Sequence, residues 1–219
     1  MEQVAVLLAR AIAWVEAIDL NPRGKVFYPA LAQALVQRYG FQVFPQKIEE
    51  FDEGKGIKFG VGRDGDTVIE QVMIYTHAIL LDTRVSTDES QRVLERALEW
   101  AAKELGLAYK GPSSIRSWQY SSQLTFRSSA LSLTSLSPAV RTLSEGISKA
   151  VEDISGEKLP FEPITLTFGH DAMKRKHPYG NFSIQRRENI PFEENHYFSD
   201  AFLPTDTHIR LLEQFEKSE

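Results

Sequence analysis

The clearest chemical signal in the sequence is a basic stretch that extends from residue 169 to residue 187. Its candidates for phosphate or nucleic-acid binding are Lys174, Arg175, Lys176, Arg186, Arg187 and Tyr179. With Asp171 included, the five cations give the stretch a local charge of +4 when its histidines are neutral. Lysine and arginine bind phosphate oxygens, and an aromatic ring stacks on a nucleic-acid base. The stretch therefore supports the hypothesis of a phosphate-directed binding protein or a nuclease-like enzyme.

The same positive charge has two other interpretations. A basic loop in an acidic chain can pair with an acidic surface of the same chain or of a partner, and residues 49–53 carry such acidic side chains. It can also be a solvated loop between two strands, because a basic run alone is a weak signal of function. The sequence leaves these three interpretations open.

A second candidate chemistry is metal binding by histidines and carboxylates near the end of the chain. The candidate ligands are His170, Asp171, His177 and His196. Imidazole and carboxylate groups bind zinc and other divalent cations, which activate water for hydrolysis. The histidines show no H-x-H, H-x-x-x-H or H-E-x-x-H spacing that would place two ligands on one element. A metal-dependent hydrolase is thus a hypothesis without a supporting motif, and we expect no cofactor.

Residues 60–65 read Gly-Val-Gly-Arg-Asp-Gly and match the phosphate-binding pattern G-x-G-x-x-G. In dinucleotide-binding folds this pattern ends a strand and begins a helix, whereas here it leads from one strand-like segment into another. A tight turn and a curved sheet explain these glycines better. The sequence contains no G-x-S-x-G nucleophile motif either, so we nominate no catalytic residue.

These candidate residues need a scaffold, and the spacing of apolar residues predicts its helices. A period of three to four residues predicts helices over about 4–18, 28–39, 86–106, 137–156 and 204–215. Ser86 with Glu89 forms a capping-box pattern, and Ser137-Pro138 is a second helix start.

Alternation of apolar and polar residues predicts the strands. They fall at about 41–44, 57–63, 68–72, 77–84, 115–126, 163–168 and 181–185. An Asp64-Gly65 turn would place Val61 opposite Val68 and Ile57 opposite Val72. Clustered strands with helices before and between them predict an α+β fold, a mainly antiparallel sheet of about six to seven strands with helices packed on one face. We expect residues 1–219 to form a single domain, with an internal hinge near 128–137.

The segment after the basic stretch is rich in aromatic side chains but poor in signals of regular structure. Its candidate interface residues are Phe192, Tyr197, Phe198 and Phe202. Large apolar side chains on a monomer surface are seldom contiguous. These residues either hold the segment against the protein's own core or dock on a partner subunit.

Composition sets limits on the function. The chain has 219 residues, 42% hydrophobic residues and a net charge of −5, as expected of a soluble globular protein that does not coat nucleic acid with its whole surface. It contains no cysteine, which excludes disulfides and thiolate chemistry and favours the cytoplasm. The N-terminal segment carries Glu2, Arg10 and Glu16, so we expect neither an export signal nor a membrane span.

Taken together, apolar residues at helix and strand spacing account for most notable positions, and little remains for reaction chemistry. The sequence therefore predicts a non-enzymatic protein-interaction or assembly module that acts through a surface and self-associates. Its expected partner is another protein or a second copy of the chain, while nucleic acid is possible but not favoured. The alternatives are the phosphate-directed protein and the metal-dependent hydrolase described above.

Overall fold

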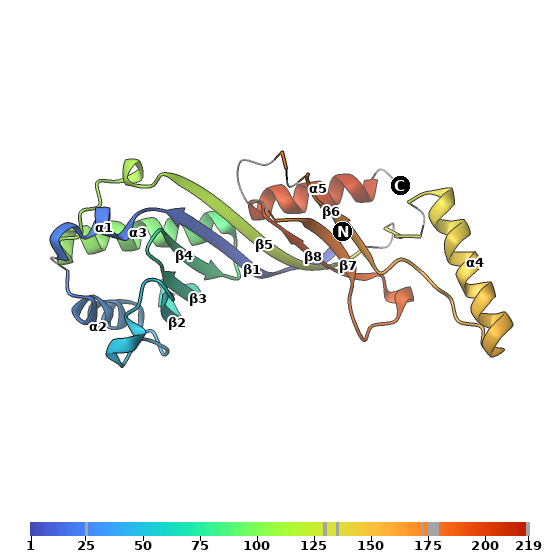
Figure 1. The fold of residues 1–219 in the computed structure, drawn as a ribbon, viewed down its shortest axis with the longest axis horizontal. Helices are drawn as coiled ribbons and strands as arrows, with labels where there is room; N and C mark the ends of the chain where they lie inside the picture. Colours follow the sequence, from blue (N-terminus) through green and yellow to red (C-terminus); the bar gives the residue numbers. More distant parts are fainter. Residues whose placement is uncertain (25, 129–130, 135, 172, 175–179, 218–219) are drawn as a thin grey trace. The chain divides into compact units, whose positions relative to one another are not determined.

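The computed structural model describes residues 1–24, 26–128, 131–134, 136–171, 173–174 and 180–217. These residues form an α+β fold in which α-helices pack on an eight-stranded antiparallel sheet (Figure 1). The predicted fold class is confirmed, with eight strands instead of six to seven. No helix within these residues combines the length and the apolar character that crossing a bilayer requires.

The strands of the sheet follow the order β2-β3-β4-β1-β5-β8-β7-β6. Their bounds are β1 Glu2–Trp14, β2 Ile57–Asp64, β3 Thr67–Ile74, β4 Ala78–Thr83, β5 Ser117–Arg127, β6 Thr165–Phe168, β7 Phe182–Arg186 and β8 His196–Ala201. The predicted strand at 41–44 is reduced to a single bridge between Val43 and Gly60.

The helices of the described residues are α1 Ala17–Leu20, α2 Tyr28–Tyr39, α3 Thr87–Leu105, α4 Pro138–Ser155 and α5 Thr205–Lys217. The predictions of α2, α3, α4 and α5 are confirmed. Local chemistry explains where α3 begins, because the Ser86 side chain accepts a hydrogen bond from the amide of Glu89. It also ends as expected, at Gly106 in the left-handed conformation.

The chain divides into two compact units, each built from separate segments. Unit 1 contains Met1–Ala5, Gln123–Phe202 and Thr207–Glu219, and unit 2 contains Val6–Ser122 and Leu203–Asp206. The long strands β1 and β5 therefore contribute residues to both units. The expected hinge near 128–137 includes residues 129, 130 and 135, which lie outside the described residues.

Unit 2 buries one hydrophobic core between its strands and the helices α2 and α3. Large side chains such as Leu35, Phe59, Leu81 and Leu98 form its centre. The unit also contains an apolar cavity of about 80 Å³ lined by residues including Leu20, Leu31 and Leu98. Among the described residues that line this cavity there is no acidic or basic side chain. The volume is well below the ~300 Å³ typical of ligand pockets, so we interpret it as a packing void.

The prediction of a helix over residues 4–18 is wrong, because residues 2–14 form the strand β1. The alanines at 9, 11 and 13 are fully buried and pair with β4, whereas Arg10 and Trp14 point to the other face and are partly exposed. Apolar residues in this segment fit a helical period and a strand period equally well. The neighbouring strands β4 and β5 decide the outcome by pairing with the backbone on both sides.

The predicted β2-β3 hairpin is confirmed, but its register is wrong by two residues. Ile57 pairs with Ile74 instead of Val72, and Phe59 pairs with Val72. The turn consists of Gly65 and Asp66, with Gly65 at a φ of 60°. The observed register places Val72 opposite Phe59, whereas the predicted register placed Glu70 there. The observed register therefore fits the buried face better.

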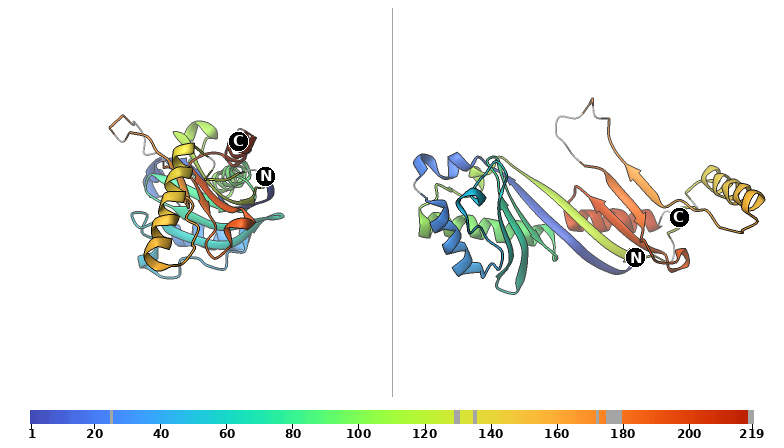
Figure 2. Two further views of the ribbon diagram at one scale, coloured as in Figure 1. Left: turned by 90° about the vertical axis from the view of Figure 1, so that its right-hand side faces the viewer. Right: turned by 60° about the horizontal axis from the view of Figure 1, so that its bottom comes forward.

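Unit 1 packs α5 against its strands (Figure 1, Figure 2). His208 and Leu212 of α5 are buried, and the His208 ring lies 5.1 Å from the Phe182 ring of β7. The aromatic segment that lacked clear signals forms the strand β8, in which Tyr197, Ser199 and Ala201 alternate as its buried positions.

Candidate protein-interaction surface

The helix α4 of unit 1 is amphipathic and has well-defined ends. The Ser137 side chain accepts a hydrogen bond from the amide of Val140, and Gly156 follows the helix in the left-handed conformation. Apolar residues recur along the helix at intervals of three or four: Val140, Leu143, Ile147, Ala150 and Ile154. Such a stripe is typical of a helix that buries one face against a partner.

The rest of unit 1 covers a polar side of α4 instead of this stripe. Ser144 is the residue of the helix that is buried. The Ser148 hydroxyl accepts a hydrogen bond of 2.8 Å from the amide of Phe161, and Lys158 lies 3.5 Å from the carboxylate of Glu152. The chain that returns after the helix therefore packs beside the stripe and leaves its centre uncovered.

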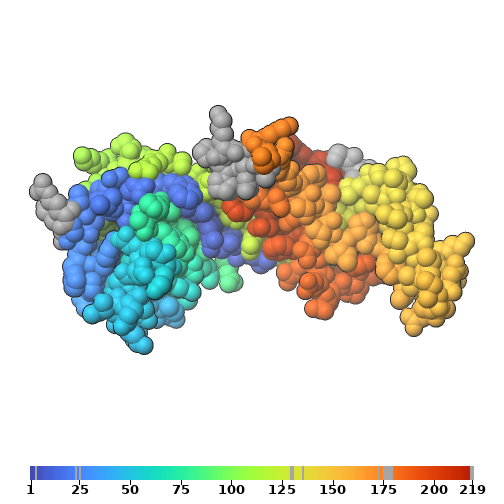
Figure 3. Space-filling view, viewed as in Figure 1, coloured from blue at the N-terminus to red at the C-terminus, as the bar shows by residue number. Residues whose placement is uncertain are grey.

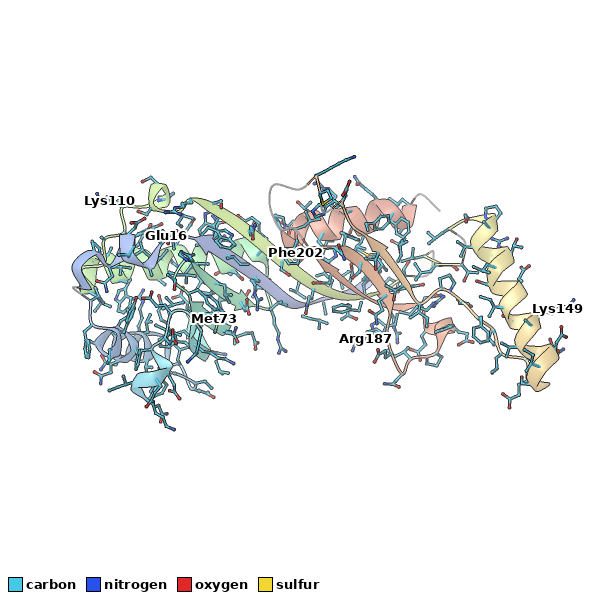
Figure 4. The ribbon with its side chains drawn as sticks, in the orientation of Figure 1. Glu16, Met73, Lys110, Lys149, Arg187 and Phe202 are labelled. Atoms are coloured by element: carbon cyan, nitrogen blue, oxygen red, sulfur yellow. The ribbon has the colours of Figure 1, made fainter. Side chains whose placement is uncertain are left out.

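The consequence is an exposed apolar helix face. The exposed fractions are 65% for Leu143, 39% for Ile147 and 87% for Ile154, and Ala150 is also exposed. We call Leu143, Ile147, Ala150 and Ile154 the α4 apolar face. In Figure 3 the helix is drawn in yellow, and its atoms lie at the molecular surface in this view. Figure 4 labels Lys149 on the same helix.

The segment after α4 exposes further apolar side chains. They are Leu159, Phe161, Ile164 and Phe168, and the last of these lies on β6, an edge strand of the sheet. Single exposed apolar residues are common on protein surfaces, but a concentration of them within about thirty residues of chain is typical of interaction surfaces.

The charges on α4 are arranged against its own dipole. Arg141 lies near the N-terminal end, Glu152 and Asp153 lie near the C-terminal end, and the last turn contains no basic residue. A helix N-terminus carries partial positive charge and its C-terminus partial negative charge. This distribution destabilises the helix in isolation, and a partner of suitable charge would relieve it.

The residues predicted to bind phosphate do not act as one group. Arg186 is 4% exposed, its side chain pairs with the carboxylate of Glu162, and its guanidinium lies 4.5 Å from the centre of the Phe192 ring. It therefore cross-links unit 1 internally. Lys174 and Arg187 are exposed, and Figure 4 labels Arg187 just after β7. Arg175, Lys176 and Tyr179 lie outside the described residues, so phosphate binding by this stretch stays a prediction.

The structure also does not bring together those candidate metal ligands that it describes. His170 and Asp171 are exposed, and His196 lies on β8 with its Nε2 atom 3.2 Å from the Thr125 hydroxyl. Burial and the nearby positive charge of Arg127 lower the pKa of His196, so its imidazole is neutral at pH 7. Within the described residues no three histidine, aspartate or glutamate side chains form a group that could hold a metal ion. His177 lies outside those residues.

The aromatic residues predicted to form an interface fall into different environments. Tyr197 is fully buried, donates a hydrogen bond of 2.8 Å to the Leu131 carbonyl and stacks on Phe126. Phe192 and Phe198 are partly exposed, and Phe202 is exposed. Tyr197 therefore serves the core of unit 1, while a partner role for the other three stays a prediction.

Sequence reasoning recognised α4 as a helix but did not select its apolar face as a site. An amphipathic pattern shows that one face is suited to burial, but not whether the same chain covers it. The reversed charges at the helix ends were the one available signal.

Comparison with known proteins does not place the chain in a family: no protein-family model and no curated protein matches its sequence.

Proposed function

We propose that this chain is a non-enzymatic assembly module that binds another protein chain through the α4 apolar face. One observation carries the proposal: α4 exposes Leu143, Ile147 and Ile154 while its polar residue Ser144 is buried against its own chain. Exposed aliphatic side chains are unfavourable in water, and their burial against a partner is the main driving force of protein association.

The form of the surface suits a helix-mediated contact. Recognition of an amphipathic helix uses apolar residues spaced by three, four and seven positions, and Leu143, Ile147, Ala150 and Ile154 have this spacing. The helix is also well capped at Ser137 and Gly156, so it is formed before a partner arrives. A preformed helix loses less conformational freedom on binding than a disordered segment does.

Buried ionisable side chains form ion pairs inside the protein, which supports a structural role over a catalytic one. Arg186 pairs with Glu162, and Asp82 pairs with Arg10, so these buried ionisable groups are held within the protein. A cytoplasmic location is part of the same proposal, because a chain without cysteine suits a reducing compartment.

Site-specific photocross-linking in the source cell tests this function. A photoreactive amino acid placed at Ile147 should form a covalent adduct with a protein that mass spectrometry identifies. The matched control places it at Glu145, which lies on the opposite side of the helix from the α4 apolar face. An adduct at 147 that is absent at 145 supports the proposal, and equal adducts or none at the two positions would contradict it.

A further inference from the structure

We propose that the occupant of the α4 apolar face is the same face of a second copy of this chain, with the two α4 helices antiparallel. This inference rests on the proposed function and names its partner. It follows from three properties of the helix: the spacing of its apolar residues, the distribution of its charges and the small residues on one flank.

The apolar residues of α4 follow a heptad repeat. Val140, Ile147 and Ile154 occupy one position of the repeat, and Leu143 and Ala150 occupy the second. Repetition at these two positions is the pattern by which two helices pack knobs into holes along a shared seam. The pattern is centred on Ile147, so a two-fold axis near this residue would bring the Val140 end of each helix to the Ile154 end of the other.

The charges select the antiparallel orientation and the self-pairing. In an antiparallel pair centred on Ile147, Asp153 of each copy lies at the level of the first turn of the other helix, where the helix dipole supplies positive charge. In a parallel pair the two acidic ends would lie together and repel. One helix thus carries both halves of a complementary surface, which an isologous contact between identical chains requires.

Small residues flank the seam on its exposed side. Ala139 and Gly146 are exposed, and a side-chain atom added at Gly146 would meet nothing within 4 Å. Small residues let two helix axes approach more closely than the usual separation of about 8–10 Å. An 18-residue helix is about 27 Å long, which makes a modest interface. We therefore expect a reversible dimer and not a permanent one.

Single-cysteine cross-linking tests the geometry, because the chain has no cysteine of its own. With a short bifunctional thiol reagent, Ile147→Cys should cross-link to itself. In a mixture, Val140→Cys should cross-link to Ile154→Cys, and neither variant should cross-link to itself. The reason is that in an antiparallel pair the two copies of residue 140 lie roughly 21 Å apart along the axis. Glu145→Cys, on the opposite side, is the matched control. Self-linking of Val140→Cys would overturn the antiparallel arrangement.

Sedimentation velocity tests the energetics on the full chain. The wild-type protein should show a concentration-dependent monomer–dimer equilibrium, and Leu143→Glu should weaken the dimer by about 100-fold, because the charge would be buried in both copies. Leu143→Gln is the second variant if the charged one fails to fold. Asp153→Lys should weaken the dimer up to about tenfold, because it places a positive charge beside the positive N-terminal end of the partner helix. An unchanged dimer in this variant would contradict the charge argument.

The results separate this inference from the function on which it rests. A strictly monomeric chain whose position 147 cross-links to a different protein would overturn self-pairing and leave the assembly function standing. A monomeric chain with no adduct at position 147 would overturn both.

Discussion

At the residue scale, the ion pair between Arg10 and Asp82 holds two central strands together on the face of the sheet opposite the alanines of β1. Arg10 donates two hydrogen bonds of 2.7 Å to the Asp82 carboxylate, whose side chain is 5% exposed, while the arginine is 31% exposed. A charged group of such low exposure is stable only while it is paired.

We therefore expect Arg10→Met to destabilise the protein by about 3 kcal/mol, because it leaves the Asp82 carboxylate buried without its cation. The control is Arg84→Met, since Arg84 pairs with Glu70 at the surface and should contribute less than about 1 kcal/mol. Urea denaturation measures both changes. Equal losses in the two variants would show that the buried pair has no special importance.

His208 gives the stability of unit 1 a dependence on pH. Burial lowers the pKa of this imidazole from 6.5 to about 4, and its Nε2 atom lies 2.8 Å from the Ser199 hydroxyl. The unfolded chain therefore binds a proton between pH 6.5 and pH 4 that the folded chain does not bind. Stability contributed by the neutral imidazole is complete above pH 6.5 and is lost as the pH falls towards 4.

The expected loss from this group is about 3 kcal/mol between pH 7 and pH 4. His208→Gln keeps a hydrogen-bonding side chain but removes the titration, so its stability should fall less over the same range. Denaturation curves of both proteins between pH 4 and pH 7 give the difference, which isolates His208 from the other titrating groups. Parallel curves would refute this assignment.

At the element scale, the glycine-rich segment of β2 is explained by packing. A side-chain atom added at Gly62 would lie 2.6 Å from the ring of Phe41 and 3.1 Å from the Tyr39 carbonyl. Gly65 adopts a positive φ in the turn, and the backbone of Gly60 pairs with Val43. Close packing at Gly62 and the turn at Gly65 therefore explain two of these three glycines without a phosphate site.

Gly62→Ala should cost about 1–3 kcal/mol, because the aromatic ring or the strand must move to admit the methyl group. The matched control is Gly146→Ala on α4, where the added atom meets nothing within 4 Å and alanine favours the helix by up to about 1 kcal/mol. Thermal denaturation of the two variants, at a protein concentration low enough to keep the chain monomeric, should show shifts of opposite sign. A neutral Gly62→Ala would mean that Phe41 has room to move.

The elements differ in how far the sequence could predict them. The helices α3 and α4 were predictable because their ends depend on local signals, the serine caps and the terminal glycines. The strand β1 was not, because its alanines suit either period until the neighbouring strands pair with it. The α4 apolar face could not be identified as a site, since exposure depends on how the rest of unit 1 folds. The pairing of Arg186 with Glu162 likewise joins residues that only the fold brings together.

At the scale of the whole molecule, the reversible dimer that we propose would link stability to protein concentration. Association through the α4 apolar face would stabilise the folded protein by mass action, because the unfolded chain has no such face. We expect the Tm of the wild-type protein to rise when its concentration is raised about 100-fold. Ile147→Lys should show one Tm at both concentrations. Scanning calorimetry measures this, and a wild-type Tm that does not change with concentration would count against self-association.

The division of the chain also determines the order in which its parts can form on the ribosome. Nearly all of unit 2 is contained in residues 6–122, whereas unit 1 combines the first five residues with segments that are synthesised later. Domains generally fold as their sequences emerge. The first residues of β1 must therefore wait, without a partner strand, until the second half of the chain appears. Most of unit 2 can form while unit 1 is still being translated, and its last segment, Leu203–Asp206, joins afterwards.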